Sequence, residues 1–159
     1  MKPAFHIAGC ALTEGSDPLL IGECVDWVRR YGATVLKQED NRALFVHFDA
    51  VQAQVIMHGC RATHANKPPV LRFGFASVVK ETAPDGSARA SERGLAQAAD
   101  LAAAAQPGQV LVSSQLGSLL QLAEIEPAAR LKAIRLPLAD GRTASAYEVQ
   151  SLRLAGAAA

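Results

Sequence analysis

The chain has 159 residues, of which 50% are hydrophobic and only 5% aromatic, and this composition fits one globular domain with a mostly aliphatic core. Its 16 basic and 15 acidic residues give a formal net charge of +1, so charge gives no reason to expect a nucleic acid or a membrane surface as a partner. No apolar stretch approaches the length of a membrane span. We expect a single cytoplasmic domain over residues 1–150 and a disordered tail at 151–159.

The cysteines argue against a disulfide framework and against a structural zinc site. Cys10, Cys24 and Cys60 are odd in number, lie far apart and form no CxxC pair. We expect them to be reduced thiols that act as small core residues. Residues 7–10 look like a lipoprotein processing box, but the apolar run before Cys10 is too short for a signal peptide and contains His6. A first core strand is the better interpretation.

The first half of the chain predicts a strand, a helix and a hairpin. The strand covers residues 5–12, and Ser16 or Asp17 can then cap a helix with Pro18 in its first turn and Gly32 as its stop. Strands at 34–37 and 43–48 flank a polar tip and predict a hairpin.

The middle of the chain predicts a second helix, a fourth strand and an exposed loop. Asp49 can cap a helix that runs to about residue 65. Strand 70–79 places Leu71, Phe73 and Phe75 on one face by alternation. Residues 80–91 are polar and rich in small residues, so we expect a loop there.

The most informative stretch is 94–113. Apolar residues recur in it at three- and four-residue steps and predict a helix with one buried stripe, formed by Leu95, Ala98, Leu101, Ala102 and Ala105. Pro107 and Gly108 end this helix, and the apolar run 110–112 predicts a strand that is buried on both faces. A short helix at 114–123 and two strands at 131–138 and 144–149 complete the chain.

This order of elements predicts the fold class. It is βαββαβ followed by a helix and a closing hairpin, which favours an α/β (α+β) ferredoxin-like sandwich with helices on one face of a mainly antiparallel sheet.

Several segments resemble the catalytic domain of class III adenylyl and guanylyl cyclases. Residues 32–37 and 43–48, around their polar tip, are similar to the second and third strands of that family, and residues 71–76 to its fourth strand. Residues 98–113 resemble the Ala-Ala-Arg-Leu helix and the Pro-Gly-Glu-Ile-Leu-Val-Ser strand of the family, and 146–149 fit its ending. The resemblance covers about residues 4–150 and implies a nucleotide-cyclase-like fold.

The residues that would bind metal in this family are replaced. The resemblance implies two metal ions, held by two aspartates, that assist cyclisation of a nucleoside triphosphate. The first aspartate belongs to a Phe-x-Asp-Ile-x-Gly-Phe strand, but residues 5–10 contain no carboxylate. The second belongs to the tip after Lys37, where Asp40 is one residue off register and Arg42 can take its place, depending on the gap. A cation there would repel a metal.

The nucleotide-binding residues of the family are mostly replaced as well. An asparagine and an arginine on the central helix of the family correspond to Ala96 and Asp100, and an aspartate that faces a triphosphate has the wrong sign. Of the two residues that form the purine site in the family, only Lys37 persists, because the position of the second residue falls near Arg89. Lys37 is therefore the candidate nucleotide-binding residue. We expect no catalytic residue, no cofactor and no metal site, and Asp40 is the only candidate metal ligand.

These replacements favour a cyclase-like domain that has lost catalysis. We expect it to act as a signalling regulatory or dimerisation module, as a homodimer or with a signalling protein partner. The chain lacks residues from both halves of a composite site, so it does not fit the role of an active complementary subunit. Two alternatives stay open. One is a sensor that binds a nucleotide through Lys37 without turnover, and the other is a divergent cyclase that uses Asp40.

Overall fold

A computed structural model of the chain describes residues 6–47, 56, 71–78, 80–86, 88–122, 131–137 and 141–149. Its helices are α1 (Pro18–Arg30), α3 (Glu92–Ala104) and α4 (Ser114–Leu122). Its strands are β1 (His6–Leu12), β2 (Thr34–Gln38), β3 (Arg42–His47), β4 (Arg72–Val78), β5 (Lys80–Thr82), β6 (Ala88–Ala90), β7 (Val110–Ser113), β8 (Leu131–Pro137) and β9 (Thr143–Val149). The predicted helix 49–65 lies outside the described residues except for Ile56, which is helical and buried. The predicted tail also lies outside them.

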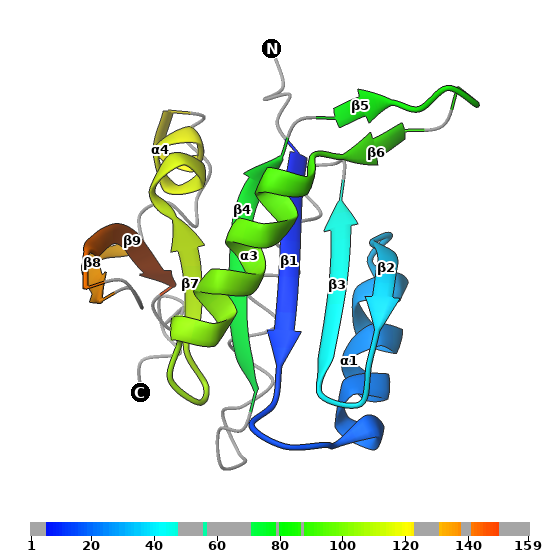
Figure 1. Cartoon of the computed structure of the whole chain (residues 1–159), viewed down its shortest axis with the longest axis horizontal. Coiled ribbons are helices and arrows are strands. Elements are labelled where there is room, and N and C mark those ends of the chain that lie inside the picture. The colour runs from blue at the N-terminus through cyan, green and yellow to red at the C-terminus, as the bar shows by residue number, and fades with distance from the viewer. Residues whose placement is uncertain are drawn as a thin grey trace, which may run out of the picture.

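Seven strands form one sheet in the order β2-β3-β1-β4-β7-β9-β8 (Figure 1). The first four strands have the ferredoxin-like order, and β4 pairs with β7 in parallel while the other pairs of this sheet are antiparallel. The predicted fold class is therefore confirmed. The prediction that Val110 to Val112 are buried on both faces is also confirmed.

The helices cover both faces of the sheet, so the prediction that they lie on one face was wrong. On one face Ile21 and Val25 of α1 pack in a cluster with Phe45 and other aromatic residues of the sheet. On the other face Ala98 and Ala102 of α3 pack with a second set of strand residues. Figure 1 shows α3 in front of the sheet and α1 behind it. The physical reason is that the central strands are apolar on both sides, and each side must be covered.

The order and direction of the strands show how α3 reaches the second face. The connections β1–α1–β2 and β4–α3–β7 would place their helices on the same face if both had the usual right-handed crossover. Because α1 and α3 lie on opposite faces, one connection is left-handed, and Figure 1 shows that it is β4–α3–β7. The segment between β4 and α3, which contains β5 and β6, is part of this left-handed connection.

Residues 80–91 also differ from the prediction of an exposed loop. Strands β5 and β6 pair with each other as a small antiparallel hairpin, separate from the main sheet. Gly86 has a φ of +86° in the connection between them, a conformation that favours glycine. Polar composition alone did not distinguish a hairpin from a loop in this segment.

The beginning and end of α1 agree with the sequence signals. Asp17 is the N-cap, and its Oδ1 accepts a hydrogen bond of 3.2 Å from the backbone N–H of Leu20. Pro18 opens the helix, and Gly32 follows its end with a φ of +91°. These details fix α1 between β1 and β2, beside the polar tip of the hairpin.

Candidate functional site

Lys37 lies on β2, the edge strand of the sheet, and a bulge decides which way its side chain faces. Val35 pairs with Phe45, but Lys37 pairs with Leu44 because the register shifts at Leu36. In a regular ladder Lys37 would pair with Ala43 and share the face of Val35, which α1 covers. The extra residue turns Lys37 to the opposite face.

That opposite face is the one that α3 covers. The pairing continues from Leu44 to Cys10 and from Cys10 to Gly74, which lies against the backbone of α3. Residues that pair directly across strands point to the same side of a sheet. Lys37 therefore projects on the α3 side, three strands away from Gly74, with Leu44 and Cys10 between them. Its side chain is exposed.

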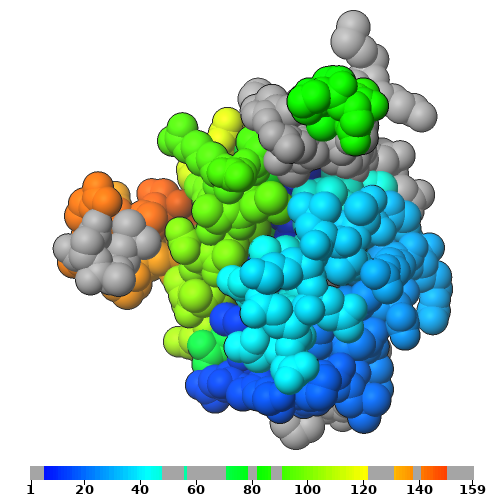
Figure 2. All heavy atoms as spheres, turned by 45° about the vertical axis from the view of Figure 1, so that its right-hand side comes forward, coloured from blue at the N-terminus to red at the C-terminus, as the bar shows by residue number. Residues whose placement is uncertain are grey.

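A second row of residues crosses the same face closer to the hairpin tip. Leu12 pairs with Arg42 on one side and with Arg72 on the other. Each of these residues stands two positions along its strand from the first row, so all of them share its face. Figure 2 shows a hollow between α3 and the β2–β3 hairpin with atoms of β1 at its bottom. We call this face, with its cations around an apolar floor, the α3-side groove.

The hairpin tip holds its charges in internal ion pairs. Glu39 Oε1 accepts hydrogen bonds from Arg42 Nη2 at 2.7 Å and Arg42 Nε at 3.0 Å, and Lys37 Nζ lies 3.7 Å away. The hydrogen bonds from Arg42 hold the pKa of Glu39 below its usual value. Glu39 is exposed, so water weakens these interactions.

Asp40, the candidate metal ligand, serves a different contact through its backbone. Its carbonyl oxygen accepts a hydrogen bond of 2.8 Å from the N–H of Asp17, and the neighbouring Asn41 carbonyl accepts one of 2.9 Å from Thr13. These bonds fasten the tip to the segment between β1 and α1. The carboxylate of Asp40 is on an exposed residue.

Arg72 is a charged residue of this face that sequence reasoning missed. Its Nη2 donates to Glu14 Oε1 at 2.7 Å, and its Nε is buried without a hydrogen-bond partner among the described residues. The alternation that places Leu71, Phe73 and Phe75 on one face also places Arg72 on the other, so the signal was available in the sequence.

The residues of the groove do not fit a metal ion. Within the described ranges no three His, Cys, Asp or Glu side chains gather as a metal site would require. The positions of β1 on this face are His6, Ala8, Cys10 and Leu12, and His6 lies at the end of the strand away from the hairpin tip. Burial raises the pKa of the Cys10 thiol to about 12, which keeps it protonated. A guanidinium at Arg42 adds like charge beside any cation.

The remaining sequence candidates lie apart from the tip. Ala96 and Asp100 are exposed on α3, while Leu95 and Ala99 are the partly buried residues that pack against the strands. The side chain of Arg89 lies outside the described residues. The structure therefore brings Lys37 and Arg42 together on one face, and Arg72 joins that face across Leu12.

Comparison of this architecture with solved structures gives its fold. The chain superposes on a monomeric mutant of the guanylyl cyclase domain of the RhoGC fusion protein from the aquatic fungus Blastocladiella emersonii, with a TM-score of 0.64, 9% identity and 95% and 97% of the two chains covered. The chain has the fold of a nucleotide cyclase catalytic domain.

Two further structures support the same assignment. The guanylate cyclase domain of RhGC from Catenaria anguillulae in complex with GTP matches with a TM-score of 0.62 and 10% identity, covering 95% of this chain and 98% of that chain. The adenylyl cyclase CyaB from P. aeruginosa matches with a TM-score of 0.55 and 16% identity, covering 94% and 95%. No protein-family model and no curated protein sequence matches the chain. In the described part of the cyclase-like domain, no helix is both long enough and apolar enough to cross a membrane.

Proposed function

We propose that this cyclase-like domain does not cyclise nucleotides and acts in the cytoplasm as a regulatory module, by pairing with a second copy or with a signalling protein. The observation that carries the proposal is the position of Arg42, whose strand position pairs directly with Leu12 on the α3 side of the sheet. This is the tip at which the family resemblance calls for a metal-binding aspartate.

The chemistry of the groove supports the loss of metal-dependent cyclisation. A magnesium or manganese ion needs hard oxygen ligands, and it must neutralise the charge of the triphosphate during attack. The floor of the groove instead contains apolar side chains and a protonated thiol, and the carboxylates of Glu39 and Glu14 are engaged by Arg42 and Arg72. A cation in this place favours binding of phosphate over binding of metal.

A product assay tests the proposal directly. The purified protein is incubated with ATP and separately with GTP in excess manganese, and cyclic nucleotide is sought by mass spectrometry. We expect no product above a heat-killed control. Product that disappears in Asp40→Ala would establish a divergent cyclase and overturn the proposal. Size-exclusion chromatography with light scattering tests whether the domain pairs with a second copy. A protein that stays monomeric at high concentration would contradict self-association.

A second candidate function is a sensor that binds a nucleotide without turnover. The observation that favours it is that Lys37 and Arg42 share one face, where both can approach a phosphate chain. Such a sensor should bind ATP or GTP in the presence of EDTA, and Lys37→Ala should weaken binding. Lys132→Ala on β8 is the matched control, because β8 and β2 are opposite edges of the sheet. Equal affinity in the two variants would exclude this role for Lys37.

A further inference from the structure

A second cavity lies at the far end of the sheet from Lys37. It has a volume of about 360 Å³ and is bounded by the β8–β9 hairpin and the start of α4. Because β2 and β8 are opposite edges of the sheet, this cavity is separate from the α3-side groove. Its volume is within the range of small-molecule sites, roughly 300–1,000 Å³.

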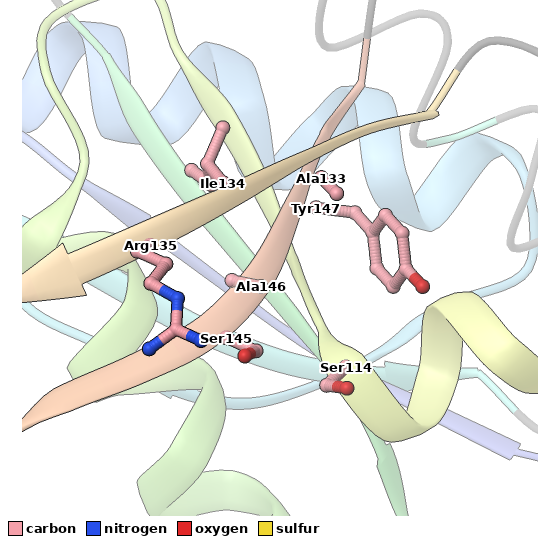
Figure 3. Close-up of a pocket in the computed structure, with 7 residues that line it drawn as sticks. All are labelled: Ser114, Ala133, Ile134, Arg135, Ser145, Ala146 and Tyr147. Atoms are coloured by element: carbon pink, nitrogen blue, oxygen red, sulfur yellow. The ribbon is translucent and has the colours of Figure 1, made fainter.

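The polar side chains of this cavity come from three different elements. Arg135 on β8 pairs directly with Ser145 on β9, so their side chains stand on the same face of the hairpin. Ser114, the first residue of α4, and Tyr147 of β9 also line the cavity. Figure 3 shows the Arg135 guanidinium beside Ser145, with Ser114 and the ring of Tyr147 beyond. One cation and two serine hydroxyl groups thus line one space beside the ring of Tyr147.

The charge of the residues that line the cavity favours an anion. The residues that line it include no carboxylate. Among the residues that the structure describes, no carboxylate forms an ion pair with Arg135. The start of α4 adds partial positive charge at Ser114. An external carboxylate or phosphate would supply a counter-charge to this guanidinium, in the fork geometry that it recognises.

The apolar side of the cavity is held in place by α4. Tyr147 pairs with Ala133 across the hairpin, and its ring packs against Gly117 so closely that a methyl group there would lie 2.5 Å from the ring atom Cε2. Tyr147 also contacts the main hydrophobic core. A ring fixed in this way offers a rigid apolar surface at little entropic cost to a ligand.

We propose that this cavity binds a small organic anion, a carboxylate or a monophosphate ester that bears an apolar or aromatic group. The anionic group lies against Arg135, Ser145 and Ser114, and the apolar group lies over Ala133 and the ring of Tyr147. The site is independent of the α3-side groove and of any nucleotide bound there. A ligand bound there would act on the domain from the opposite edge of the sheet, independently of the α3-side groove.

Titration calorimetry with two anionic probes tests the proposal. Phenyl phosphate and benzoate represent the two anionic classes, and benzyl alcohol is the neutral analogue. We expect saturable binding of at least one anion to the intact protein, and binding of the alcohol that is roughly ten-fold weaker or undetectable. Arg135 is exposed, so its replacement leaves the core intact.

Substitutions of Arg135 test whether its charge is needed for anion binding. Arg135→Gln should weaken the anion roughly ten-fold, while Arg135→Lys should keep part of the affinity because it keeps the charge. Lys132→Gln is the control, since it removes a cation from the same strand but from a residue that does not line the cavity. Equal losses in Lys132→Gln and Arg135→Gln, undiminished affinity in Arg135→Gln, or no saturable binding of either anion at millimolar concentration would each overturn the proposal.

Discussion

Gly74 of β4 lies directly beneath the Ala98 carbonyl of α3. A methyl group at Gly74 would overlap that oxygen and would lie 2.5 Å from the backbone nitrogen of Ala102. Both obstacles are backbone atoms, which cannot turn aside as a side chain can. The pair therefore fixes how closely α3 approaches the sheet, and with it the wall of the α3-side groove.

We expect Gly74→Ala to destabilise the domain by about 3 kcal/mol, because the added carbon forces the helix away from the sheet. The free energy of unfolding in urea measures this change. Gly22→Ala is the matched control on α1, where a new Cβ meets nothing within 4 Å. That control should stabilise the protein by about 0.5–1 kcal/mol, since alanine is the better helix former. A Gly74→Ala protein as stable as the control would contradict the close packing.

Removing the carboxylate at the hairpin tip should strengthen anion binding. Glu39→Gln removes the negative charge that Lys37 and Arg42 both approach. Exposed ion pairs of this kind are screened by water, so we expect only about a two- to five-fold gain in ATP affinity, measured in EDTA. Glu23→Gln, on an exposed residue of α1, serves as the control. Unchanged affinity in Glu39→Gln would show that Lys37 and Arg42 do not contact the phosphates.

The two described cysteines should resist modification in the folded protein. Burial raises the pKa of Cys10 and of Cys24 to about 12, so their thiols stay protonated at pH 8. In a Cys60→Ser background, a chromogenic disulfide reagent at pH 8 should label neither residue until denaturant is added. Rapid labelling under native conditions would contradict their burial.

The same pKa values give a direction for the stability in alkali. In the unfolded chain these thiols ionise near their ordinary pKa of 9.0, well below their folded pKa. The unfolded state therefore binds fewer protons between about pH 9 and pH 12, and stability falls across that window as pH rises. Cys10→Ala should flatten this dependence, which urea titrations at several pH values can measure.

A methyl group on α4 should disturb the second cavity. Gly117→Ala pushes on the ring of Tyr147, so we expect weaker phenyl phosphate binding and a loss of about 1–3 kcal/mol of stability. Ser118→Ala, at an exposed position of the same helix, should change neither quantity. Unchanged affinity in Gly117→Ala would mean that the ring does not form part of the binding surface.

Sequence reasoning located most elements because their signals were local. The cap at Asp17, the alternation of Phe73 and Phe75, and the alanine stripe of α3 each depend on neighbours within a few residues. The face that α3 covers was missed because it depends on the hand of a connection, and the usual right-handed rule fails there. The cavity at Arg135 was missed because α4 and both strands of the β8–β9 hairpin form it together, and no pattern within one element signals it.

The face of the sheet on which Lys37 lies was also missed, because it depends on the pairing between β2 and β3 and not on local sequence. Period-two alternation places Lys37 with Val35, and only the pairing with β3 reveals the extra residue between them. No property of Lys37 or of its neighbours in sequence signals that shift. The family resemblance names Lys37 as a candidate, but the side of the sheet that it faces was not available from the chain alone.

The bulge at Leu36 gives β2 one residue more than a regular ladder with β3 needs between Val35 and Lys37. Deletion of Leu36 would leave Val35 opposite Phe45 and Lys37 opposite Leu44, so both side chains would keep their faces of the sheet. Loss of this one codon is therefore neutral for the placement of Lys37, whereas a deletion within a strand that has no bulge moves every following side chain to the other face.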